Sequence, residues 1–191
     1  EVNQILNIGV HTHFNTYVTS LKGIVDKGYD AIFVFTGAPK GKDLQIPGRE
    51  EGKANIHVGI EWLASVAFEH TYSIGKKVIV LGGGNTAMDC CRTSRRLGGE
   101  EVKVIVRSPF TEMKASPWEK EDAMHEDIPI LDNHVPKEFV IENGKLTGMT
   151  FEKVYAHWDN GKRKLIPTGE PEVFFPADDV IIAIGQENRF E

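Results

Sequence analysis

A run of glycines between two apolar segments constrains the fold of this 191-residue chain more than any other feature. The apolar segment 76–81 runs into the glycines at 82–84, and the residues after them predict a helix that reaches about Leu97. The glycine pair 98–99 is typical of a helix end, and the segment 102–106 is apolar again. Strand, glycine turn, helix and strand make a βαβ unit, which should cross over right-handed into a parallel pair.

The spacing inside the glycine turn indicates a bound dinucleotide. Gly82, Gly84 and Ala87 match the pattern G-x-G-x-x-G/A, placed after a strand and at the start of a helix. The first glycine allows a tight turn, the second lets the backbone approach a pyrophosphate, and the small alanine lets helix and strand pack closely. Since a helix start offers free N–H groups and a positive dipole end, we expect it to hold the phosphates. The expected cradle is Gly82, Gly83, Gly84, Asn85 and Thr86. The alternative is a tight packing turn with no ligand.

The end of the second strand selects between nucleotides. NAD-binding sites usually place Asp or Glu about 20 residues after the glycines, where it holds the ribose 2′-hydroxyl. Here the strand 102–106 ends in Arg107 and Ser108, without a carboxylate. An arginine can pair with a 2′-phosphate through charge-assisted hydrogen bonds, and a serine can add a donor. We therefore predict a preference for NADPH over NADH that rests on Arg107, the alternative being an ordinary surface arginine.

Two charged residues in the first turns of the predicted helix are also assigned to the cofactor site. Asp89 is expected to orient the glycine turn. Arg92 is expected either to meet the phosphates or to pair with Asp89 in a purely structural contact, and the sequence leaves both possibilities open.

The remaining pattern predicts an α/β fold: a Rossmann-like parallel sheet flanked by helices, with a small antiparallel β-meander inserted in it. The predicted elements outside the βαβ unit are helices at 21–26, 60–68 and 117–126, and strands at 14–18, 29–39, 128–131, 139–141, 146–151, 163–166 and 178–185. Tight hairpin turns are expected at 143–144 and 159–161, and the stretch 39–55, rich in Gly, Pro and charge, is interpreted as a linker.

Two strand ends share one shape. Residues 30–37 and 178–185 each begin with Asp, continue with about five apolar residues, and reach Gly seven positions on. The repeat suggests two related nucleotide-binding domains, although two buried strands can also look alike by chance. Because parallel sheets bind ligands at the carboxyl ends of their strands, we expect Ile184 and Gly185 to lie near the nicotinamide.

Composition narrows the remaining function classes. The formal net charge of −6 disfavours a nucleic-acid or anionic-membrane partner. No apolar run is long enough to cross a bilayer and no signal-peptide pattern is present, so we expect a cytoplasmic protein. Cys90 and Cys91 offer no Cys-x-x-Cys motif, hence no redox dithiol or iron–sulfur cluster within this chain. His11 and His13 have no third ligand nearby, so no metal site is expected, and no catalytic acid, base or nucleophile is assigned.

A longer string makes the motif more specific. The sequence Gly-Gly-Gly-Asn-Thr-Ala-Met-Asp at 82–89, with Val-Ile-Val-Arg at 104–107 and Glu-Met at 112–113, resembles the small (beta) subunit of NADPH-dependent glutamate synthase and its relatives. The strand ends 29–38 and 177–186 are similar to that family too. The resemblance covers essentially the whole chain.

The resemblance implies a flavoprotein in which an NADPH domain interrupts an FAD domain. A hydride would pass from NADPH to FAD, and electrons would then move through iron–sulfur clusters to the glutamate synthase large subunit as partner. Residues 1–48 would be the C-terminal part of the first FAD-domain segment, and residues 49–191 the NADPH-binding domain, closed by the strand 178–185. The FAD fingerprint and the cysteine-rich domain lie outside this chain, which by itself would bind NADPH but neither hold FAD well nor turn over.

Two departures and two alternatives accompany the resemblance. The family often has Arg-Arg and Met-Pro-Ala where this chain has Arg-Ser at 107–108 and Met-Lys-Ala at 113–115, and it usually has a small Ala at position 36, which is Thr here. One alternative is another flavoprotein of the same build, of the dihydropyrimidine dehydrogenase or ferredoxin–NADP electron-transfer type. The other is a nucleotide-binding module with no redox role. Disulfide reductase activity is disfavoured because the necessary cysteine pair is missing.

Overall fold

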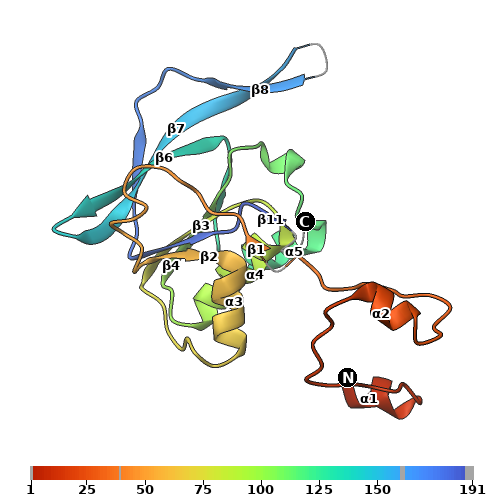
Figure 1. Cartoon of the computed structure of the whole chain (residues 1–191). Coiled ribbons are helices and arrows are strands. Elements are labelled where there is room, and N and C mark those ends of the chain that lie inside the picture. The colour runs from red at the N-terminus through yellow and green to blue at the C-terminus, as the bar shows by residue number, and fades with distance from the viewer. Residues whose placement is uncertain (1, 39, 160–161, 188–191) are drawn as a thin grey trace. The chain divides into compact units, whose positions relative to one another are not determined.

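The computed structural model describes residues 2–38, 40–159 and 162–187, and it divides the chain into two compact units, 1–36 and 37–191 (Figure 1).

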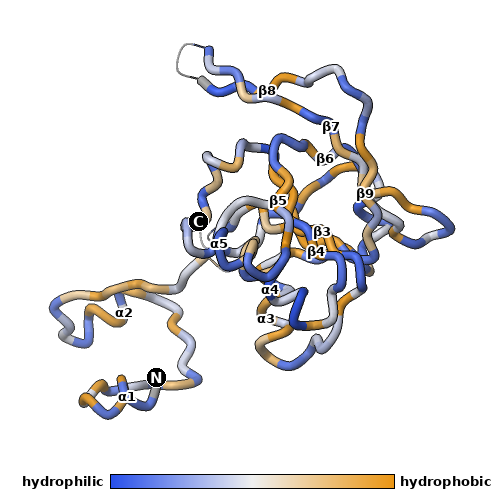
Figure 2. Tube along the Cα trace, turned by 180° about the vertical axis from the view of Figure 1, so that it is seen from behind, coloured by the Kyte–Doolittle hydropathy of each residue, from blue (hydrophilic) through white to orange (hydrophobic). Residues whose placement is uncertain are grey.

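A five-stranded parallel sheet forms the centre of the second unit. Its order is β2-β10-β3-β4-β5, and all four neighbouring pairs are parallel. The strands are β2 (Ile56–Val58), β10 (Asp179–Ile182), β3 (Lys77–Leu81), β4 (Glu101–Ile105) and β5 (Ile130–Leu131). Every residue of β10 and all but the first of β3 are buried, as expected for strands covered on both faces. Figure 2 shows hydrophobic residues along β3 and β4.

The alternation of side chains along these strands separates two cores. Val78 and Val80 pack with the helices α3 (Gly59–Ala67), α4 (Asn85–Arg96) and α5 (Pro117–His125). Ile79 and Leu81 point to the other face, where they pack in one core with Phe139 and Phe151 of the antiparallel sheet. The unit therefore has three layers, with the parallel sheet in the middle.

The antiparallel sheet is the predicted meander. It consists of β6 (His134–Glu142), β7 (Lys145–Asp159), β8 (Lys162–Pro167) and β9 (Val173–Pro176). Asn143 and Gly144 have φ of 52° and 75°, which confirms the tight hairpin turn between β6 and β7. The inner part of β7 pairs with β6 and β9, whereas its outer part pairs with β8. In the second predicted hairpin turn, residues 160–161 lie outside the described residues.

Most of the predicted elements of this unit are confirmed within a few residues, and the differences are local. The closing strand stops at Ile182, and the chain continues into the short strand β11 (Gln186–Glu187), which pairs with β1 (Lys40–Gly41). Neither β1 nor β2 was predicted, because each is very short. The stretch interpreted as a linker is packed rather than free: Leu44 and Ile46 contact the meander-side core, and the Phe139 N–H donates to the Pro47 carbonyl (2.9 Å).

The first unit contains two short helices, α1 (Val2–Asn7) and α2 (Leu21–Val25), the second of which confirms the helix predicted there. The strands predicted at 14–18 and 29–39 are wrong: no described residue before Lys40 lies in a strand. Phe33 and Phe35 are 86% and 85% exposed and stack on each other at 5.8 Å. A strand needs neighbours to satisfy its backbone N–H and C=O groups, and the described part of this unit supplies none.

Candidate dinucleotide site

The glycine turn lies at the carboxyl end of β3, between the ends of β4 and β10. Gly82 has φ of +138°, and a Cβ at this position would lie 2.1 Å from the Ala183 carbonyl oxygen. Its own N–H donates to the Ile105 carbonyl (3.2 Å), and the Ala183 N–H donates to the Leu81 carbonyl (2.7 Å). Only glycine fits this position, so the tight turn predicted for Gly82 is required by its two neighbouring strands.

Gly84 is different, because nothing in the described part of the chain requires it to be glycine. It has φ of −103° and ψ of 175°, an extended conformation that any residue can adopt, and apart from its chain neighbours no described atom lies within 4 Å of where its Cβ would be. A missing side chain that would point into open space is what the approach of a ligand to the backbone requires. The structure therefore fits a pyrophosphate at this turn.

The start of α4 offers backbone N–H groups to an anion. Gly84 is the N-cap and provides no side-chain cap. Among the described residues, no acceptor is found for the N–H groups of Gly84, Asn85 and Thr86. Unpaired N–H groups at the positive end of a twelve-residue helix favour a bound phosphate.

The side chains of the cradle turn towards neighbouring segments and leave these N–H groups free. Asn85 Oδ1 accepts a hydrogen bond from the Ser116 N–H (2.8 Å), and Thr86 Oγ1 accepts one from Gln186 Nε2 (3.0 Å). Ser116 is the N-cap of α5, as expected, but its side chain bonds to Asn85 and makes no cap hydrogen bond. Gly83 packs near Met113, and its carbonyl accepts from the Ala115 N–H (2.9 Å).

The predicted 2′-phosphate residues follow β4 directly. The strand end is anchored, because the Val106 carbonyl accepts from the His134 N–H (3.0 Å) and the Ser108 carbonyl from the Asn133 N–H (3.5 Å). The Arg107 side chain is exposed, and it makes no ion pair or hydrogen bond with any part of the chain that the structure describes. A guanidinium without a partner at this place can serve an incoming phosphate.

Arg92 is occupied by α5. Its Nε donates to Glu126 Oε1 (2.8 Å), and its Nη1 lies 3.3 Å from Glu119 Oε2 and 3.1 Å from Asp122 Oδ2. The hydrogen bond to Glu126 raises the pKa of Arg92. The pair with Asp89 that the sequence left open is not formed: Asp89 is exposed and has no hydrogen bond within the described ranges. The structure thus brings Arg92 to a helix–helix contact, and its role at the phosphates stays a prediction.

The carboxyl end of β10 lies beside the same turn. Ala183 contacts Gly82, Ile184 is 44% exposed, and the Gly185 carbonyl accepts from the Lys42 N–H (3.0 Å). The bond between Gln186 and Thr86 ties this end to α4, a link that sequence reasoning missed because the two residues are 100 positions apart.

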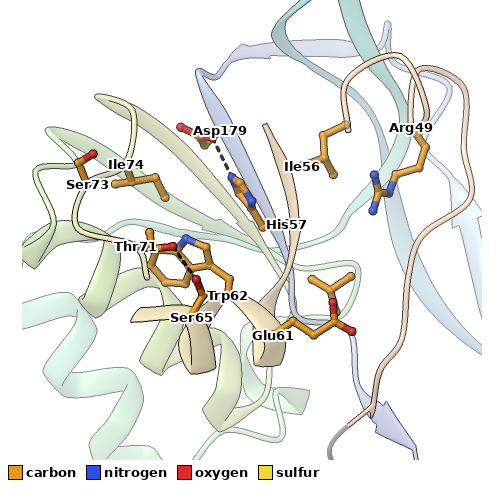
Figure 3. A pocket seen from close by; sticks show the side chains of 11 residues that line it. Arg49, Ile56, His57, Glu61, Trp62, Ser65, Thr71, Ser73, Ile74 and Asp179 are labelled. Carbon is orange, nitrogen blue, oxygen red and sulfur yellow. Dashed lines mark hydrogen bonds and ion pairs between the residues drawn. The ribbon is translucent and has the colours of Figure 1, made fainter. Parts of the chain in front are cut away.

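A cavity of about 400 Å³ lies elsewhere, along the edge strand β2 (Figure 3). Within it, His57 Nε2 lies 2.9 Å from Asp179 Oδ1, and the Asp179 carboxylate also accepts from Asn55 Nδ2 (3.1 Å) and the Gly75 N–H (2.8 Å). Asp179 begins β10, whereas the glycine turn follows the end of the parallel neighbour β3. The cavity is therefore separate from the dinucleotide site, and nothing in the sequence pattern predicted it.

No helix within the described residues is long and apolar enough to span a membrane. No cluster of three or more His, Cys, Asp or Glu residues able to hold a metal ion was found in those ranges.

The βαβ unit, the glycine turn and the free arginine after β4 define the class of protein: a dinucleotide-binding α/β domain. Its family is that of the pyridine nucleotide-disulphide oxidoreductases, to which the chain belongs; the family pattern matches residues 6–190.

Three curated relatives illustrate the similarity. The NADP(+)-dependent formate dehydrogenase subunit beta of Moorella thermoacetica is 34% identical over 97% of this chain. The NADPH-Fe(3+) oxidoreductase subunit beta of Geobacter sulfurreducens is 31% identical over 98%, and the glutamate synthase [NADPH] small chain of Halomonas elongata is 32% identical over 82%. The chain covers 27%, 29% and 35% of these proteins, respectively. The resemblance to the glutamate synthase small subunit and its relatives is confirmed at the level of the family.

Solved structures support the fold. Mycobacterium tuberculosis FprA in complex with NADPH has a TM-score of 0.68 and 16% identity, covering 86% of this chain and 52% of FprA. Thioredoxin reductase of T. acidophilum has a TM-score of 0.58 and 20% identity, covering 76% and 41%. At these identities the likeness concerns the fold alone, and it confirms the predicted fold class.

Proposed function

We propose that this chain is the NADPH-binding part of a flavoprotein oxidoreductase that passes a hydride from NADPH to FAD. The proposal rests chiefly on Gly84: a glycine that the protein itself does not require, at the head of a helix with free N–H groups. Arg107, at the end of the neighbouring strand β4, supplies the cation that a 2′-phosphate needs. Membership of the pyridine nucleotide-disulphide oxidoreductase family supports the redox role.

All the predicted site residues except Asp89 and Arg92 have a place in this proposal. The N–H groups at the start of α4 would bind the pyrophosphate, and Arg107 and Ser108 the 2′-phosphate. Ile184 and Gly185, at the end of β10, would lie near the nicotinamide. The two cofactors supply the hydride chemistry, and the chain supplies position and charge. FAD would be held mainly by segments outside this chain, as the resemblance implies.

The final electron acceptor is a finer part of the proposal. The glutamate-synthase-like string at 82–89 and the 32% identity to a glutamate synthase small chain favour transfer through iron–sulfur clusters, held outside this chain, to a glutamate synthase large subunit in the cytoplasm. The 34% identity to a formate dehydrogenase subunit beta favours a second candidate, the flavoprotein subunit of another NADP-linked complex. Both candidates share the step from NADPH to FAD.

The experiment is anaerobic reduction of the flavin in the full-length protein. The reduction is monitored as the loss of absorbance of the oxidised flavin. NADPH should bleach the flavin at much lower concentrations than NADH. Arg107→Gln should raise the NADPH concentration needed for half-maximal rate about tenfold and leave that for NADH unchanged, because a charge-assisted hydrogen bond is lost. The matched control is Lys76→Gln, which removes a cation just before β3, away from the glycine turn.

Two results would contradict the proposal. Nucleotide binding without any flavin reduction would favour the non-catalytic module. An unchanged NADPH-to-NADH ratio in Arg107→Gln would remove the basis for the NADPH assignment.

A further inference from the structure

The outer hairpin of the meander forms an arm whose purpose the fold does not explain. The arm consists of residues 154–159 of β7 and of β8, which pair with each other. Figure 1 shows it extending away from the parallel sheet, and Trp158 on it is 59% exposed. A two-stranded ribbon of this kind adds little stability of its own.

One side chain of the arm contacts a segment beside the predicted dinucleotide site. Arg163 on β8 places its Nη1 2.9 Å from Glu112 Oε2. Glu112 ends the 3-10 helix η1 (Phe110–Glu112), which begins two residues after Ser108. That helix is held in place, because the Phe110 N–H donates to Asp132 Oδ2 (2.8 Å) and the next residue, Met113, packs near Gly83. Arg163 is thus anchored to the loop that follows the predicted 2′-phosphate residues and packs near the glycine turn.

The rest of the Arg163 guanidinium is unused. Its Nε and Nη2 are shielded from solvent and have no hydrogen-bond partner among the residues that the structure describes. These two nitrogens form the side-on fork that matches two oxygens of a phosphate or carboxylate, whereas Glu112 occupies the end of the group. Burying such donors without a partner costs free energy, because their hydrogen bonds to water are lost. A ligand that brings an acceptor would replace those hydrogen bonds.

We propose that Arg163, paired with Glu112 on the loop that follows Arg107 and Ser108, is a second cation for the 2′-phosphate of NADPH. This inference rests on the proposed function and adds a specificity-determining residue to it. A 2′-phosphate is a dianion, and β4 itself supplies one arginine followed by a serine. The arm would contribute the missing charge from a segment more than 50 residues further along the chain.

The test is a binding titration of the full-length protein with NADPH, NADH and 2′,5′-ADP. Arg163→Gln should weaken NADPH and 2′,5′-ADP about tenfold, the loss of a charge-assisted hydrogen bond, and leave NADH unchanged. Arg163→Lys keeps the charge but not the fork, so it should weaken the same two ligands by less. The control is Lys164→Gln on the same arm, whose side chain pairs with Asp159 and should have no effect.

The outcomes separate the inference from the proposed function. If wild-type protein binds neither NADPH nor 2′,5′-ADP, the proposed function fails. If it binds both, and Arg163→Gln either changes nothing or weakens NADH as much as NADPH, the inference alone is overturned. In that case Arg163 only fastens the arm to Glu112.

Discussion

Two glycines of one motif have different reasons to be glycine. At Gly82 the reason is internal, since a side chain would collide with the Ala183 carbonyl. At Gly84 the described chain leaves open space, which fits the ligand that we propose there. The structure confirms the tight turn predicted for Gly82, whereas the approach of a pyrophosphate to Gly84 stays a prediction. The sequence left Arg92 open, because helical spacing gives the direction of a side chain but not the three carboxylates that α5 brings to it.

The buried thiols of α4 give a prediction at the same scale. Cys90 and Cys91 are fully buried, and burial raises the pKa of Cys91 to about 12, and that of Cys90 also, from the usual 9.0. Above about pH 9 the unfolded chain loses these protons while the folded chain keeps them. The contribution of the two thiols to the free energy of unfolding is therefore fully present below about pH 9. It falls as the pH rises further, by up to about 1.4 kcal/mol per pH unit for each thiol.

The measurement is the urea midpoint of the full-length protein at about pH 8 and about pH 10. The double variant Cys90→Ala, Cys91→Ala should lose less stability between these two pH values than wild type does. If the urea midpoints of both proteins fall equally between the two pH values, burial does not raise the pKa of the two thiols as the structure indicates.

At the scale of elements, the sequence predicted those helices and strands whose formation depends on their own local pattern. The strands β3 and β10 are apolar after their first residue, and β4 is apolar except for Glu101 and Lys103. The helix α3 has an apolar face, α4 follows the glycine turn and α5 has a Ser-Pro start, so all six were predicted. The run 29–39 has the same apolar signal but forms no strand in the described chain, since a strand depends on partners that its own sequence does not contain. The three-residue β2 and the ribbon of β1 and β11 were missed for lack of length.

The contact between α4 and α5 carries a prediction of its own. Arg92→Gln should lower the thermal midpoint of the full-length protein by a few degrees, about 1 kcal/mol, because a partly exposed network of three carboxylates loses its centre. NADPH affinity should stay within about twofold of wild type, since hydrogen bonds to α5 already hold this guanidinium.

Arg96→Gln is the matched control. Arg96 pairs with Glu126 alone among the described residues and is more exposed, so its loss should cost less. A large fall in NADPH affinity with an unchanged midpoint in Arg92→Gln would instead place Arg92 at the phosphates.

At the scale of the molecule, three layers position one site. The parallel sheet sets the ends of β3, β4 and β10 side by side, the helices add the positive end of α4, and the meander contributes an arm. The layers followed from the sequence, because strand burial and the hairpin signals are local. The path of the arm to Glu112 did not, since it depends on how two distant segments meet. The chain spans about a quarter to a third of the length of the curated relatives described above.

The central claim is that the open space at Gly84 is the seat of a dinucleotide pyrophosphate. The most direct test is a titration of the full-length Gly84→Val variant with NADPH. Valine suits the extended backbone there and its Cβ meets no atom of the described chain, so the thermal midpoint should change little while NADPH affinity falls about tenfold to a hundredfold, with a smaller loss in Gly84→Ala. A stable Gly84→Val protein that binds NADPH as tightly as wild type would contradict the claim.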